Sequence, residues 1–165
     1  MLTNDEFLLE FFNSEAEDSS VDTTISPLTD MVAGKAYSRI MVSDYQMALQ
    51  HESGWILLDT EAECCSDTWF AEVIKAKDIM GKTIKQVEEL RLHECEVKDD
   101  GRGSQDVDLI YGYKLRAEDG SFCLITFRNS SNGYYGGSVS ARERSLFSPL
   151  EHTDITLSKL WTNEE

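Results

Sequence analysis

"LQHESGWILLDTEAECCSDTW", residues 49–69, and "LRAEDGSFCLITFRNSSNGYY", residues 115–135, follow the same pattern along the chain. Each begins with a strand-like stretch, turns at acidic residues closed by a glycine (Gly54 or Gly120), continues as an apolar strand and ends in a polar cluster. Apolar, β-branched and aromatic runs separated by short glycine-containing turns are typical of antiparallel strands. The two segments therefore predict two β meanders, each followed by a polar cluster.

The similarity between the two halves extends toward the N-terminal side of each meander. A Gly-Lys pair precedes a strand-like run both in "VAGKAYSRIMV" (32–42) and in "IMGKTIKQVEEL" (79–90). The second half is longer because of "ECEVKDDGRGSQDVD" (94–108), a charged stretch that we expect to be an exposed loop. We interpret residues 32–69 and 79–137 as two half-repeats, with duplication and independent origin both left open. If the halves are related, their polar clusters can face one another.

One segment between the halves decides the expected fold class. In "SDTWFAEVIKAKDIM" (66–80), Ser66 can cap a helix, and Trp69, Val73 and Ile74 then share one face. We therefore predict an α+β fold: a mainly antiparallel, strongly bent sheet from the two strand-rich halves, one central helix, and a short acidic N-terminal helix.

The N-terminal helix is predicted from residues 4–13. Thr3 and Glu6 fit a capping box, and phenylalanine and leucine residues recur behind them at helical spacing. We assign residues 1–30 to this helix and a linker, and residues 31–165 to a single domain. The helix either docks on its own domain or enters a groove of a partner. The residues predicted to contact a partner are Asp5, Glu6, Phe7, Glu10, Phe11, Glu15, Glu17 and Asp18.

Charge is the strongest compositional signal. The 165 residues include 31 acidic and 15 basic ones, a formal net charge of −16. Such a charge disfavours direct binding to nucleic acid or to an anionic membrane, and favours a partner protein with a basic surface. No apolar run is long enough to cross a bilayer, and the N-terminus lacks the cationic start of a secretion signal. We expect a protein of the bacterial host cytoplasm with reduced cysteines, and the sequence predicts no oligomeric state.

The two polar clusters are the candidate catalytic and ligand-binding sites. Cys64 or Cys65 can serve as a nucleophile or, with His93 and Cys95, as a zinc ligand, but the spacing fits no common motif. The second cluster is either a turn that satisfies its own polar groups or a contact surface with two tyrosines. We predict no metal, no cofactor and no catalytic residue. Candidate ligand-binding residues are Cys64, Cys65, Ser66, Trp69, Asn129, Ser131, Asn132, Tyr134 and Tyr135.

Two motifs carry a resemblance to a known family. Glu63 to Trp69 follow a pattern of an acidic residue before Cys-Cys-Ser-x-x-Trp, and Asn129 to Gly137 read Asn-Ser-Ser-Asn-Gly-Tyr-Tyr-Gly-Gly. With these motifs, residues 32–141 resemble an uncharacterised family of small domains found in bacteriophage and prophage genomes. The resemblance implies a phage setting and no established activity, and it leaves residues 1–30 outside the pattern.

Three hypotheses of function follow. The first is a non-enzymatic, phage-type acidic protein that inhibits a host nucleic-acid-handling or defence complex, as an anti-CRISPR or anti-restriction protein, by occupying a basic surface. A literal DNA mimic is a narrower version of it. The second is a binder or sponge for a small, nucleotide-like ligand. The third is a cysteine-dependent enzyme.

Overall fold

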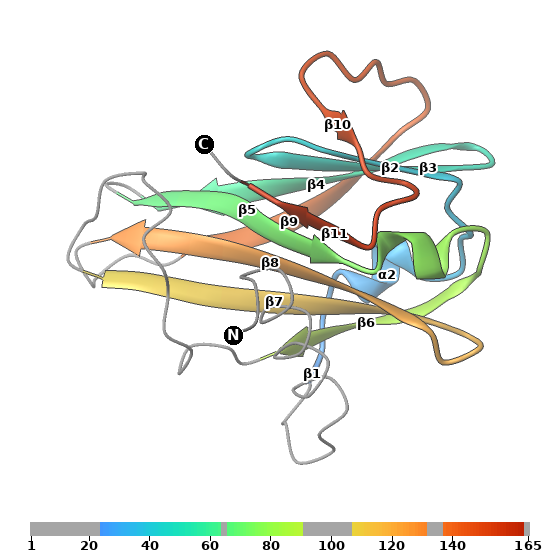
Figure 1. The fold of residues 1–165 in the computed structure, drawn as a ribbon, viewed down its shortest axis with the longest axis horizontal. Coiled ribbons are helices and arrows are strands. Elements are labelled where there is room, and N and C mark those ends of the chain that lie inside the picture. Colours follow the sequence, from blue (N-terminus) through green and yellow to red (C-terminus); the bar gives the residue numbers. More distant parts are fainter. Residues whose placement is uncertain (1–23, 64–65, 91–106, 132–136, 164–165) are drawn as a thin grey trace, which may run out of the picture.

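Two antiparallel sheets pack face to face in a computed structural model, which describes residues 24–63, 66–90, 107–131 and 137–163 (Figure 1). The six-stranded sheet has the order β1 (Thr24–Ile25), β6 (Ile84–Leu90), β7 (Val107–Ala117), β8 (Phe122–Ser131), β5 (Asp67–Ile74) and β11 (Leu160–Thr162). The five-stranded sheet has the order β10 (Thr153–Asp154), β2 (Arg39–Val42), β3 (Gln46–His51), β4 (Gly54–Ala62) and β9 (Gly137–Arg144). The described helical elements are short: α2 (Thr29–Val32) and the 3₁₀-helix η1 (Ala76–Ile79).

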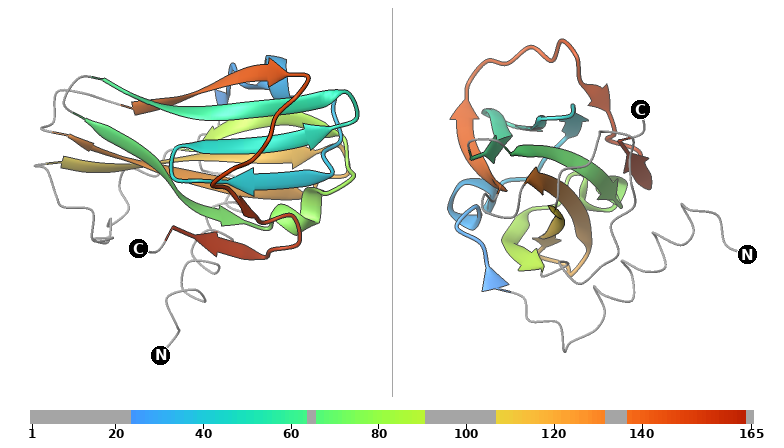
Figure 2. Two further views of the ribbon diagram at one scale, coloured as in Figure 1. Left: turned by 90° about the horizontal axis from the view of Figure 1, so that it is seen from above. Right: turned by 90° about the vertical axis from the view of Figure 1, so that its left-hand side faces the viewer.

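The two halves of the chain have the same strand order and exchange their last strands. Strands β2, β3 and β4 run in sequence through one sheet, and the chain then crosses to the other sheet as β5. Strands β6, β7 and β8 do the same in the second sheet, and the chain crosses back as β9. Strand β5 pairs with β8 and β9 pairs with β4, as the two views in Figure 2 show. Each half therefore completes the sheet of the other half.

The predicted α+β fold class is wrong, because the described chain is mainly β and forms two sheets. The predicted central helix at 66–80 is instead β5 followed by the single turn η1. Thr68, Trp69 and Phe70 favour extended backbone, and every residue of β5 after Asp67 is buried, so no polar face remains for an amphipathic helix. A bulge between Phe70 and Glu72 shifts the pairing register.

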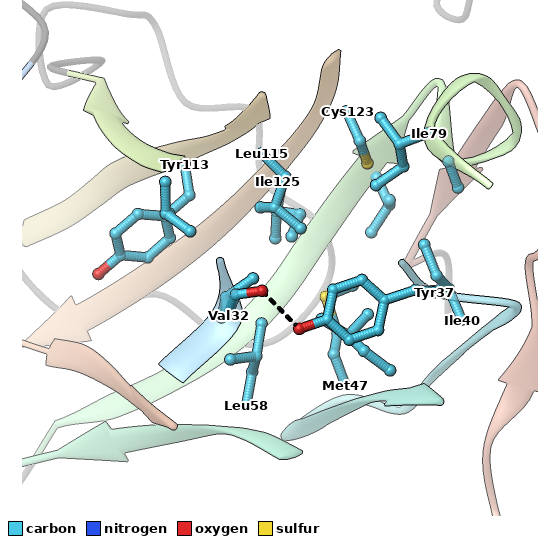
Figure 3. Packing of buried hydrophobic residues seen from close by; sticks show 14 of the residues in the cluster. Val32, Tyr37, Ile40, Met47, Leu58, Ile79, Tyr113, Leu115, Cys123 and Ile125 are labelled. Carbon is cyan, nitrogen blue, oxygen red and sulfur yellow. Dashed lines mark hydrogen bonds between the residues drawn. The ribbon is translucent and has the colours of Figure 1, made fainter. Parts of the chain in front are cut away.

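The main core lies between the sheets (Figure 3). Strands β3 and β4 contribute Met47 and Leu58, and β7 and β8 contribute Leu115 and Ile125. The buried Tyr37 hydroxyl donates a hydrogen bond of 2.7 Å to the Val32 carbonyl, and so fixes α2 against the core. Burial is the main cause that raises the pKa of Tyr37. These contacts make the sandwich one packed unit.

The outer face of the five-stranded sheet has a smaller apolar cluster of Met41, Ala48, Trp55 and Leu57. Phe147, from the segment between β9 and β10, packs on this cluster with its ring centroid 5.3 Å from that of Trp55. Burying these side chains removes apolar area from water and holds the segment against the sheet.

The N-terminal part of the fold begins at Thr24. Residues 24–25 form an edge strand on β6, and Leu28 and Val32 join the core, so the last residues of the expected linker contribute to the sandwich. The predicted helix at 4–13 lies outside the described residues. None of the described helices is long and apolar enough to cross a membrane.

Candidate functional site

The described ends of the two predicted polar clusters lie on paired strands. Asp67 and Thr68 of β5 lie opposite Ser130 and Asn129 of β8 in the antiparallel register. Thr68 shares the inner face with Phe70, which contacts the core, and Asn129 shares it with Phe127. Polar groups therefore lie between the two sheets, at the end where the chain crosses from β4 to β5 and from β8 to β9.

Asn129, Thr68 and Gly137 form a polar junction at this end of the sandwich. The Asn129 side chain is fully buried, and its Nδ2 donates a hydrogen bond of 2.9 Å to the Thr68 hydroxyl. Among the described residues, Asn129 Oδ1 has no hydrogen-bond partner, although it is buried. Gly137 approaches so closely that an added Cβ would overlap the Thr68 hydroxyl and lie 2.9 Å from Asn129 Nδ2. Three strands from both halves are thus joined through one small polar contact.

Most other candidate ligand residues lie elsewhere or outside the described residues. Ser66 donates its hydroxyl to the Glu63 carbonyl at 2.9 Å and precedes β5, so it does not cap a helix. Trp69 is 3% exposed, so its ring is not presented to solvent for stacking on a ligand. The structure does not describe Cys64, Cys65, Asn132, Tyr134, Tyr135 or the side chain of Ser131. The proposed partner residues Asp5 to Asp18 are likewise outside the described part of the chain.

The sequence reasoning missed an ion pair on the outer face of the six-stranded sheet. Arg128 Nη2 lies 3.2 Å from Glu72 Oε1, and both side chains are more than nine-tenths buried. The Thr126 hydroxyl donates to the other oxygen of Glu72. Alternation of Leu124, Thr126 and Arg128 along an apolar strand was the available signal, because such residues share one face of a strand.

A cluster of cations surrounds the ring of Phe122 on the same sheet. The Nζ atoms of Lys75 and Lys114 each lie 4.7 Å from the ring centroid, and Cζ of Arg116 lies 5.9 Å from it. A ring face attracts cations electrostatically, which partly offsets the repulsion among the three groups. Burial chiefly, together with Arg116 and Lys75, lowers the pKa of Lys114, while Glu88 raises it.

The carboxylate of Glu88 lies beside this cluster, because Glu88 pairs with Lys114 across β6 and β7. Burial raises its pKa, but hydrogen bonds from Arg116 and Gln86 and the charges of Arg116 and Lys114 outweigh that effect, so the pKa is lowered. Arg116 Nε donates to Glu88 Oε1 at 3.1 Å, and Gln86 Nε2 donates to the same oxygen at 2.7 Å. Glu88 is therefore ionised and already bound within the chain.

The thiol chemistry of the described residues is limited. Cys123 is buried in the core, where burial chiefly and Asp78 secondarily raise its pKa. The thiol is therefore protonated and inaccessible at neutral pH, which is a packing role and not that of a nucleophile. No cluster of three metal-ligating side chains occurs within the described ranges.

The negative charge is distributed unevenly along the chain. The described residues include 17 acidic and 12 basic ones, a net charge of −5, which leaves −11 of the total of −16 for the other segments. Residues 1–23 alone carry seven acidic residues and no lysine or arginine. The sandwich is thus only moderately acidic.

Comparisons with known proteins place the chain in an uncharacterised group. An uncharacterised protein of Acanthamoeba polyphaga mimivirus is 35% identical over 83 residues, which cover 49% of this chain and 63% of that viral protein. The chain thus matches less than two thirds of the length of this relative. No solved structure matches the chain significantly. A family described as "Domain of unknown function (DUF7448)" matches residues 30–141. An uncharacterised family with a viral relative was expected and is confirmed, and the chain belongs to the DUF7448 family.

Proposed function

We propose that the chain is a non-enzymatic binding protein of viral origin that occupies a basic surface on a host protein. The observation that carries the proposal is the concentration of carboxylates in residues 1–23, which hold seven acidic residues and no basic one. Host proteins that handle nucleic acid, including defence complexes, are the proposed class of target, because they present basic grooves. A phage as the source, and inhibition as the outcome, belong to the same proposal.

The carboxylates of the sandwich support this division of roles. Several of them are engaged inside the chain: Asp59 with Arg142 at 2.8 Å, Asp119 with Lys82 at 2.9 Å, and Glu72 with Arg128. A carboxylate that is paired with a cation of its own chain attracts the cations of a partner protein less strongly. The negative charge offered to a partner is therefore expected to come mainly from residues 1–23.

Long-range electrostatic attraction would raise the rate at which the chain associates with such a target. Complementary charge raises association rates, and its effect falls with salt because the Debye length shortens from about 30 Å at 0.01 M to about 8 Å at 0.15 M ionic strength. We therefore expect binding that weakens steeply between these salt concentrations.

The experiment is capture of host proteins from a bacterial lysate by the tagged full-length chain, with and without excess duplex DNA. Retained proteins should be basic nucleic-acid-binding ones, and both salt and duplex DNA should displace them because they compete for the same groove. Captured proteins should be identified by mass spectrometry and then purified for a titration with the chain.

A matched pair of full-length variants tests the assignment to residues 1–23. In the first variant the six acids Asp5, Glu6, Glu10, Glu15, Glu17 and Asp18 become amides. In the control the exposed acids Glu52, Glu61, Glu63, Glu118, Glu143 and Glu151 become amides, which changes the net charge equally. Loss of capture in the first variant alone supports the proposal. Equal loss in both variants, or capture that duplex DNA does not affect, contradicts it.

A further inference from the structure

The outer face of the six-stranded sheet is buried although it points away from the core. Side chains alternate along a strand, so Lys114 and Leu124 face outward where Leu115 and Ile125 enter the core. Leu124 is 1% exposed and Lys114 is 2% exposed. The two described helical elements contribute to the core between the sheets, through Val32 of α2 and Ile79 of η1. These exposures are those of the chain by itself, so the cover of the outer face must come from another part of the chain.

The register places this face beside the first described residues. Ile25 pairs with Glu88, Glu88 with Lys114, Lys114 with Leu124, and Leu124 with Ile74. These residues form one row across five neighbouring strands, and Leu160 of β11 extends it to the sixth. Because neighbouring strands lie about 4.8 Å apart, the row is about 24 Å long. Residue 23 therefore joins the fold at one edge of this face.

Around Phe122 the face is positively charged in a protein that is strongly negative. The cations there are Lys75, Lys114 and Arg116 and the carboxylate is that of Glu88, a local net charge of +2. Arg128, Glu72 and Asp67 lie farther along the same face, where Arg128 donates a hydrogen bond to Glu72. The cations are interleaved with large apolar side chains, namely Trp69, Ile74, Leu90, Ile110, Phe122 and Leu124.

We propose that residues 1–23 of the same chain dock on this face. The segment supplies the complementary chemistry, with seven carboxylates and a set of apolar side chains that includes Phe7, Leu8, Phe11 and Phe12. As an α-helix, residues 4–13 would span about 15 Å, which fits within the row. The carboxylates would pair with the cations around Phe122, and the phenylalanines would cover Leu124 and its apolar neighbours.

Docking gives the acidic segment (residues 1–23) an intramolecular binding site. The carboxylates proposed above to contact a host protein are then neutralised until a more basic surface competes for them. The docking itself does not depend on the proposed function, because it is a property of the isolated chain.

The test uses the full-length protein and a carbodiimide, which joins a carboxylate to a lysine only when the two are in direct contact. We expect cross-links from acids of residues 1–23 to Lys75 and Lys114, identified by mass spectrometry. Cross-links from residues 91–106 to these lysines, with none from residues 1–23, overturn the proposal. So does a set of cross-links from residues 1–23 that is confined to Lys35 and Lys77.

Lysine acetylation rates provide a second, independent measurement. In the full-length Phe7→Ser/Phe11→Ser variant, acetylation of Lys114 should accelerate at least about tenfold, equivalent to about 1.4 kcal/mol, while Lys35 and Lys77 keep their rates. The Cys123 thiol serves as the folding control, because it stays unreactive only while the core is intact. Unchanged acetylation of Lys114 in a folded variant overturns the proposal. Inorganic phosphate provides one more comparison. If phosphate slows acetylation of Lys114 in that variant, while residues 1–23 do not slow it in the wild type, the site binds a free anion and the proposal is overturned.

Discussion

Asn129 of β8 donates a hydrogen bond of 2.9 Å to the hydroxyl of Thr68 on β5, and this contact joins the two halves of the chain inside the sandwich. Both residues are buried, and they belong to the polar clusters that follow the two matched meanders in the sequence. The clusters thus meet through strand exchange.

Removal of the Asn129 amide should destabilise the fold. Asn129→Ala deletes the hydrogen bond to Thr68 and leaves a small void, so we expect a loss of about 1–3 kcal/mol in the free energy of unfolding. Urea denaturation measures the change. In a double-mutant cycle, the effects of Asn129→Ala and Thr68→Val on the free energy of unfolding should be coupled. Additive effects of the two substitutions would contradict a direct contact.

Gly137→Ala should be destabilising because of the same junction. The new methyl group would overlap the Thr68 hydroxyl and lie 2.9 Å from its Cγ2, so β5 or β9 would have to shift. The expected cost is about 1–3 kcal/mol, as for other overpacked sites. Combination with Thr68→Ala removes the two clashing atoms of Thr68, leaves Asn129 Nδ2 in place, and should recover part of the loss in thermal denaturation. A Gly137→Ala protein as stable as the wild type would show that the junction is looser than described.

The ion pair between Glu72 and Arg128 should show asymmetric mutational effects. Glu72→Leu leaves a buried guanidinium without this carboxylate, and we expect a loss of about 3–5 kcal/mol. The double variant Glu72→Leu/Arg128→Met removes both charges and should be considerably more stable than the single variant. Chemical denaturation of the four proteins tests this expectation. If the double variant is no more stable than Glu72→Leu, the cost of the single substitution does not come from a buried guanidinium that lacks its carboxylate.

His152 should make stability depend on pH in the mildly acidic range. Burial lowers its pKa more than Glu151 raises it, and Phe147, Gln46 and Glu151 are the groups around it. The folded-state pKa is below the unfolded value of 6.5, so its contribution to stability is present above that value and is lost as pH falls through the folded-state pKa.

An NMR titration of the His152 ring should give a pKa below 6.5, and His152→Asn should flatten the stability profile between pH 7 and pH 5. A folded-state pKa above 6.5 would reverse the sign and refute this prediction. Since the Phe147 ring meets His152 edge-on and packs at a tilt against Trp55, chemical shifts of Trp55 should follow the same titration.

The sequence predicted individual strands better than their arrangement. Both glycine-closed turns occur, at Gly54 and Gly120, and the apolar runs behind them are β4 and β8. The helix prediction failed because Trp69, Val73 and Ile74 fit one helix face, while burial on both sides of β5 depends on partners distant in the chain. Pairing of Val73 with Ile125 links residues far apart in sequence, and no local pattern encodes it.

The candidate site was predictable only as separate clusters. Thr68 was not singled out, although its neighbours Ser66 and Trp69 were, because its role depends on Asn129 across the sheet. The cations around Phe122 were also missed, because Lys75 lies between β5 and η1, far in sequence from Lys114 and Arg116 on β7.

The strand exchange also bears on how such a sandwich can arise and come apart. Because β5 completes the sheet of the second half and β9 that of the first, two copies of one half have the strands to close the same architecture as a symmetric pair. The connected chain has the strand topology of such a pair joined into one polypeptide. A single cut between the halves should leave the two fragments interlocked, and only unfolding should separate them.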